Sequence, residues 1–117
     1  MTADLGLTAQ GEDAPPIVRS FVYYITWPGV DMIKIGTSQA LRKRLASLSR
    51  STGKPQLLVV EPGGYQRERS RHSQFASLRT AGTELFRPAT VLLEHIDNLC
   101  QKIPHWRGMA NVGHEWD

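Results

Sequence analysis

The stretch FVYYITWPGVDMIKIGTS, residues 21–38, decides the fold. Its first half is crowded with β-branched and aromatic residues, which predicts a strand from about residue 18 to residue 26. Pro28 and Gly29 then supply the backbone conformations of a tight turn. The segment after the turn returns as a second strand, so the stretch predicts an antiparallel hairpin.

Side chains alternate between the two faces of a strand, so the two adjacent tyrosines of the hairpin must diverge. Tyr23 shares one face with Phe21, whereas Tyr24 lies on the opposite face. In the second strand, Lys34 lies on the face opposite to that of Ile33 and Ile35. The hairpin therefore carries a tyrosine on one arm and a lysine on the other.

The rest of the chain predicts one more strand and three helices. Ser38 is expected to cap a helix over about residues 39–49, whose leucines recur every three or four positions. The apolar run QLLVV predicts a strand at residues 56–60. Further helices are expected over about residues 65–80 and from Pro88 to about residue 103. The fold class is therefore α+β, with a small three-stranded antiparallel sheet flanked by about three helices.

One face of the second predicted helix combines several chemically active groups. Glu68, His72, Phe75 and Arg79 follow one another at helical spacing and so share that face. Glu68 stands between two arginines, where it stays ionised and can hold a hard divalent cation. The alternative is a surface glutamate in weak salt bridges.

Charge is concentrated in the middle of the chain. The 117 residues carry a formal net charge of +3, but residues 33–79 hold ten lysines and arginines against two acids. Such a block attracts phosphate backbones through its charge and through the release of counterions. A solvated basic face on an ordinary domain is the alternative.

The ends of the chain differ from its middle. Residues 1–16 lack periodicity and end in two prolines, which predicts a disordered leader before a domain at residues 17–103. The sequence does not determine the conformation of the tail at residues 104–117. Its tryptophans either stack on bases or pack over the core, and packing over the core is favoured. The single Cys100 and the lack of a signal or membrane segment predict a cytoplasmic protein.

The motifs FVYYI, IKIGTS, LRKRL, RERSRH and ELF occur in this order between Phe21 and Phe86. Together they resemble the GIY-YIG nuclease superfamily, most closely its short phage-associated and fungal branch, in which KIG replaces YIG. The resemblance covers a little over half of the chain. It implies a metal-dependent endonuclease that hydrolyses phosphodiester bonds in nucleic acid, with DNA favoured over RNA.

The resemblance also implies a role for each matching residue. Tyr23 would orient or activate the attacking water, and Lys34 stands where the second motif has its tyrosine. Arg44 would stabilise the phosphate, and Glu68 would bind one Mg²⁺ or Mn²⁺ ion. His72 matches the histidine one helical turn beyond that glutamate. The ammonium of Lys34 can lower the pKa of a neighbouring phenol or hold a phosphate oxygen.

Binding of the nucleic-acid backbone is expected from basic side chains near these positions, namely Lys43, Arg67, Arg71 and Arg79. A fused or separate DNA-targeting partner would supply specificity. A second hypothesis is an inactive nucleic-acid-binding or interaction module of the same fold. A third is a structural metal or ligand protein that uses the histidines, although their spacing matches no known ligand pattern: His72, His95, His105 and His114.

Overall fold

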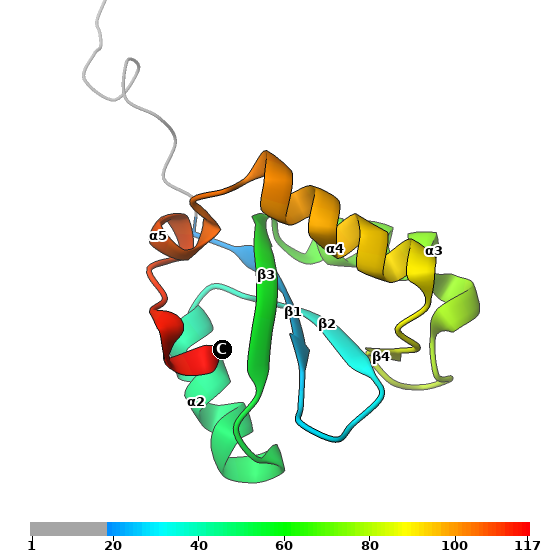
Figure 1. The fold of residues 1–117 in the computed structure, drawn as a ribbon, viewed down its shortest axis with the longest axis horizontal. Coiled ribbons are helices and arrows are strands. Elements are labelled where there is room, and N and C mark those ends of the chain that lie inside the picture. Colours follow the sequence, from blue (N-terminus) through cyan, green and yellow to red (C-terminus); the bar gives the residue numbers. More distant parts are fainter. Residues whose placement is uncertain (1–18) are drawn as a thin grey trace, which may run out of the picture.

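The computed structural model describes residues 19–117. The predicted leader at residues 1–16 and the first residue of the predicted first strand lie outside this range. Within it, strands and short helices alternate around one layer of sheet (Figure 1). The predicted α+β class is confirmed.

The sheet has four antiparallel strands in the order β3-β1-β2-β4. Strand β1 spans Phe21–Thr26, β2 spans Ile33–Ser38, β3 spans Gln56–Pro62 and β4 spans Leu85–Phe86. The hairpin of β1 and β2 is confirmed. The fourth strand is an addition to the predicted three, because a segment expected to be an extended link pairs with the start of β2.

Helices cover both faces of the sheet. Figure 1 shows α3 (Tyr65–Gln74) and α4 (Thr90–Lys102) together on one side, with α2 (Leu41–Thr52) and α5 (Trp106–Ala110) on the other. The core between these layers is apolar and includes the largest fully buried side chains of the sheet. This arrangement leaves the β4 edge of the sheet beside α3.

The helix after the hairpin starts later than predicted, and Ser38 is not its N-cap. Ser38 is the last residue of β2, where it pairs with Phe21. Its hydroxyl oxygen accepts a hydrogen bond from the backbone N–H of Ala40 at 2.9 Å, and Ala40 takes the cap position without a side-chain bond. Ser38 therefore belongs to the strand, and the helix begins at Leu41, two residues later than predicted.

The second predicted helix is shorter than residues 65–80. Helix α3 ends at Gln74, and a 3₁₀ turn at Ala76–Leu78 follows it. The tighter turn still buries Phe75 and Leu78, as predicted. Arg79 has an extended backbone beyond this turn, so the prediction that it shares one helical face with Glu68 is wrong.

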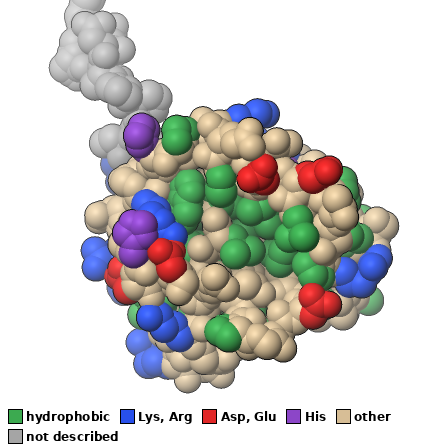
Figure 2. All heavy atoms as spheres, in the orientation of Figure 1, with side chains coloured by type: hydrophobic (Ala, Val, Ile, Leu, Met, Phe, Trp, Pro, Cys, Tyr) green, Lys and Arg blue, Asp and Glu red, His purple; other side chains and the backbone are tan. Residues whose placement is uncertain are grey.

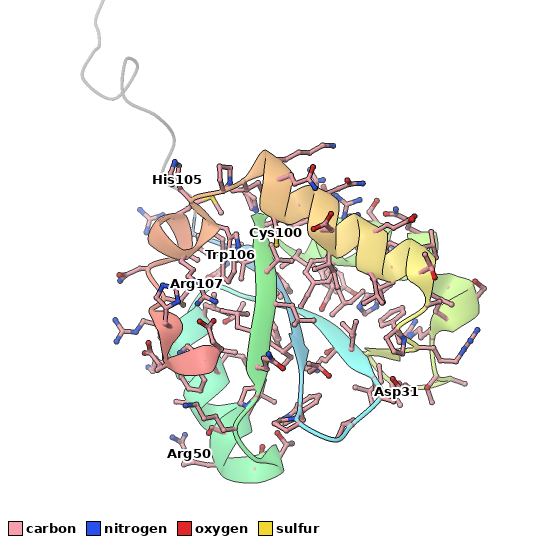
Figure 3. The ribbon with its side chains drawn as sticks, in the orientation of Figure 1. Asp31, Arg50, Cys100, His105, Trp106 and Arg107 are labelled. Atoms are coloured by element: carbon pink, nitrogen blue, oxygen red, sulfur yellow. The ribbon has the colours of Figure 1, made fainter. Side chains whose placement is uncertain are left out.

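The tail packs against the sheet. The indole of Trp106 is 8% exposed, and the Arg107 guanidinium lies 4.3 Å from the centre of its ring. Figure 3 shows both residues on the side of the molecule where α5 lies against β3. Trp106 therefore covers the core, which confirms packing over base stacking for this residue.

The face shown in Figure 2 is apolar at its centre and basic only at its rim. Large hydrophobic side chains that remain exposed include Val91 and Leu93 of α4. Among residues 19–117 no helix is long and apolar enough to cross a membrane.

Candidate active site

Glu68 lies in the first turn of α3 and is nearly buried, with 6% of its surface exposed. A carboxylate at this end of a helix is favoured by the helix dipole. It opens into a cavity of about 420 Å³, lined by Tyr65, Glu68, Arg69, His72, Ser73, Ala76, Arg79 and Glu84. The predicted metal ligand therefore sits in a hollow that brings acids and bases together.

A second carboxylate, Glu84, stands beside Glu68. It immediately precedes β4, and the pairing of Lys34 with Leu85 brings it next to β2. The ammonium of Lys34 donates to Glu84 Oε1 at 2.5 Å. In the sequence, Glu84 appeared only as the first residue of the ELF motif. Its position directly before two apolar residues was the one sign that it could border a strand.

The two carboxylates affect each other's ionisation. Burial raises the pKa of Glu68 above its ordinary value, and the nearby negative charge of Glu84 raises it further, while His72 and Lys34 oppose the shift. A positive ion between the carboxylates would relieve this repulsion. The ammonium of Lys34 already supplies one positive charge to Glu84.

His72 is fixed against the sheet one helical turn after Glu68. Its Nε2 lies 2.8 Å from the carbonyl oxygen of Ile35, and its ring packs against Phe86 with centroids 5.0 Å apart. Because a carbonyl oxygen can only accept, Nε2 carries a proton and donates it in this contact. His72 therefore positions α3 on β2.

Tyr23 contacts β2 from the neighbouring strand, but it does not line the Glu68 cavity. It pairs with Gly36, and its phenol crosses over that glycine. The side chain is 0% exposed, and its hydroxyl has no hydrogen-bond partner among the described residues. Because the hydroxyl is shielded from solvent, its contact with an attacking water stays a prediction.

Gly36 is required by this close approach. A Cβ atom at this position would lie 2.5 Å from the Tyr23 hydroxyl oxygen and 2.6 Å from the ring carbon that carries it. We expect Gly36→Ala to lower the free energy of unfolding by about 1–3 kcal/mol through overpacking. Urea unfolding measures the change.

Gly108→Ala is the matched control for this substitution, since a Cβ there meets no atom within 4 Å. It is expected to leave stability unchanged or slightly raised, because alanine favours helix. Equal unfolding midpoints for the two variants would contradict the close contact between Tyr23 and Gly36.

Arg44 is not brought into the Glu68 cavity. It is exposed on α2 and lines a separate hollow of about 500 Å³ together with Lys43 and Arg50. Figure 3 shows Arg50 pointing away from the body of the molecule. The contact of Arg44 with phosphate stays a prediction. Arg44 itself belongs to a basic surface on α2.

The arginines of α3, together with Arg79 beyond it, divide between two roles. Arg71 makes two hydrogen bonds to Glu61, at 2.8 and 2.9 Å, and Arg67 lies 3.6 Å from the same carboxylate. The structure therefore commits Arg71 to an internal ion pair rather than to the predicted phosphate contact. Arg69 and Arg79 line the cavity instead, and sequence analysis had not selected Arg69.

Glu61 is the centre of a buried polar network that sequence analysis missed. It is 2% exposed and accepts a hydrogen bond of 2.6 Å from the Tyr24 hydroxyl, which also lies 2.9 Å from His95 Nε2. Burial alone would raise the pKa of Glu61, but the hydrogen bonds from Arg71 and Tyr24 outweigh it, and the net shift is downward. The network ties β1, β3, α3 and α4 together.

The donor set fits one hard divalent ion. Within residues 19–117 no group of three or more His, Cys, Asp or Glu side chains could hold a metal. Mg²⁺, however, is commonly bound by one or two carboxylates and completes its shell with water and phosphate. Glu68 and Glu84 provide that pair. The histidine-based metal hypothesis has no support among the same residues, since His72 and His95 face other partners.

Comparison with known proteins gives one match. The family model described as the T5orf172 domain matches residues 20–103, which is most of the chain. This family is phage-associated and linked to endonuclease-like proteins. No curated protein and no solved structure matches the chain.

Proposed function

Since the chain belongs to the T5orf172 domain family, we propose that it is a metal-dependent endonuclease that hydrolyses phosphodiester bonds of nucleic acid, with DNA the favoured substrate. The observation that carries the proposal is the cavity at α3. Two close carboxylates lie at its centre, and two arginines and a histidine surround them. Carboxylates that could hold a metal ion, next to cationic groups that could bind a phosphate, support the proposal.

Each group in the cavity has a physical role in this reaction. Glu68 and Glu84 would hold one Mg²⁺ or Mn²⁺, which when bound neutralises charge that develops on the phosphate and the leaving oxygen. The guanidinium groups of Arg69 and Arg79 would bind the non-bridging oxygens. Lys34 pairs with Glu84 and would add positive charge near the phosphate.

We further propose that the mechanism is of the GIY-YIG type. The ordered motifs and the antiparallel hairpin support this assignment. Tyr23 would then align the attacking water, whose oxygen bonds to phosphorus as the scissile P–O bond breaks. The shielded hydroxyl must first be uncovered by a shift of the side chains above it. We place the activity in the cytoplasm, with specificity supplied by a DNA-targeting partner or fused unit.

A nucleic-acid-binding module without catalysis is the second candidate. Two observations favour it: the Tyr23 hydroxyl has no contact with solvent, and the Lys34 ammonium is engaged by Glu84. Under this proposal the basic side chains still bind the backbone, but no bond is broken. The two candidates differ in whether a divalent ion changes the nucleic acid.

Metal dependence separates the candidates. We expect the protein to convert supercoiled plasmid to nicked circles with Mg²⁺ or Mn²⁺, and to lose this activity in EDTA and regain it on addition of excess metal. The reaction is followed on agarose gels, with DNA binding measured in parallel by gel shift. A plasmid that stays intact with every metal, while the protein still shifts it, would establish the binding module.

A further inference from the structure

A second and larger cavity lies next to the candidate active site. Its volume is about 790 Å³, and it opens between the hairpin turn, the end of α2 and the segment before β4. The lining is mainly apolar and consists of Trp27, Pro28, Val30, Lys34, Leu48, Thr52, Gly53, Lys54, Thr83, Glu84 and Leu85. Its size is that of a small-molecule site.

Trp27 gives this cavity a fixed aromatic surface. Its indole N–H lies 3.1 Å from both Thr52 Oγ1 and the carbonyl oxygen of Gly53, and donates to them. The one polar atom of the ring is therefore already satisfied by the protein. What the indole offers to a ligand is its π-face, which suits a flat ring.

The charges around the cavity favour an anionic ligand. Lys34 and Lys54 both line it, against the single acid Glu84, which is itself paired with Lys34. Gly53 also lines the cavity, and a Cβ at this position would meet no atom within 4 Å. The site thus combines an aromatic face and apolar walls with a cationic rim.

The two cavities share one lining residue, Glu84. Glu84 borders both, and Lys34 lines the larger one while holding Glu84. Because the two cavities adjoin at Glu84, a strand bound through its phosphate in the Glu68 cavity would have the larger cavity as the neighbouring site for a base. A base within a duplex is stacked and paired, and only an unpaired base is free to enter.

We propose that this second cavity binds one unpaired nucleobase next to the phosphodiester that is cut, so that the substrate is single-stranded or locally opened nucleic acid. The inference rests on the proposed function for the position of the phosphate. The occupant is a base of DNA or RNA, because the stacking surface is common to both.

The direct test observes Trp27 in the wild-type chain. Protein labelled with 5-fluorotryptophan gives one ¹⁹F resonance for each of the three tryptophans, and Trp27→Phe assigns that of Trp27. In EDTA, we expect a single-stranded DNA or RNA oligonucleotide to shift the Trp27 resonance selectively. A blunt duplex of the same sequence should leave it in place. Binding of the oligonucleotide is measured in parallel by fluorescence anisotropy. If the oligonucleotide binds and the Trp27 resonance does not shift, the inference is overturned.

Affinity gives an independent measure. We expect Trp27→Ala to weaken binding of a single-stranded oligonucleotide about tenfold, the usual order for loss of one base–aromatic stack. Leu93→Ala, at an exposed apolar position of α4, is the control and should change nothing. An oligonucleotide of abasic residues should bind the wild type and Trp27→Ala equally. Equal loss of affinity for the abasic chain would overturn base recognition.

These results separate the inference from the proposed function. Plasmid nicking with an unmoved Trp27 resonance would retain the nuclease and remove the base site. A selective Trp27 shift without nicking under any metal would retain the base site on a binding module. A resonance that responds instead to an apolar peptide and to no oligonucleotide would overturn the base site.

Discussion

Glu68→Gln is expected to lose plasmid-nicking activity by about a hundred- to a thousandfold, the range seen when one group that stabilises the transition state is removed. The amide keeps the shape of the side chain but removes the negative charge that holds the metal. Because the arginines of the cavity are untouched, binding of the nucleic acid should stay within about twofold, as measured by gel shift. The nicking rate is measured with saturating Mn²⁺.

Stability distinguishes this loss from misfolding. The pKa of Glu68 is raised in the folded protein, so its ionised form opposes folding at neutral pH, and this cost disappears as the pH falls through the folded pKa. Replacement by a neutral amide should therefore not lower the melting temperature. Glu94→Gln, at an exposed position of α4, is the matched control. Wild-type nicking by Glu68→Gln would refute the role of this carboxylate.

Glu61→Ala is expected to lower the free energy of unfolding by about 3–5 kcal/mol, the usual cost of removing one partner from a buried ion pair. The substitution leaves the Arg71 guanidinium, only 19% exposed, without its two hydrogen bonds. It also leaves the buried Tyr24 hydroxyl with His95 alone. Urea unfolding measures the loss, and Glu94→Ala serves as the control. A loss below about 1 kcal/mol would contradict the importance of the network.

The pH dependence of this effect has a definite sign. The pKa of Glu61 lies below its ordinary value of 4.5, so its contribution to stability is fully present above that value and is lost as the pH falls through the folded pKa. The difference in stability between wild type and Glu61→Ala should therefore shrink in acid. A difference that stays constant from neutral pH to strong acid would show that the ionised pair is not its source.

Sequence reasoning predicts the hairpin well because its signals are local. The alternation in β1 and the turn at Pro28 and Gly29 fix which tyrosine faces which side. The end of α3 was not predictable in the same way. Helical spacing continued through Arg79, but the burial of Phe75 and Leu78 in a tighter turn, a tertiary requirement, ended the helix at Gln74.

The site shows the same division. Glu68 and His72 lie four residues apart on one helix, so their proximity follows from the sequence alone. The contact of Lys34 with Glu84 joins residues fifty positions apart and depends on the fourth strand. Arg44 matched a motif, yet its hollow shares no lining residue with the Glu68 cavity. A motif specifies the types of residues and their order, whereas tertiary packing determines which side chains come together.

The two-residue length of β4 has a further consequence. Past this strand, the outer edge of β2 would offer unpaired backbone groups to any passing strand, the usual route to sheet aggregation. Here the Ile35 N–H donates to the carbonyl oxygen of Glu84, and the Ile35 carbonyl oxygen is taken by the His72 imidazole. Glu84 and His72, both in the proposed site, therefore also satisfy the Ile35 backbone groups at this edge of the sheet. A substitution at His72 would then leave the Ile35 carbonyl oxygen at this edge without its partner, as well as change the candidate site.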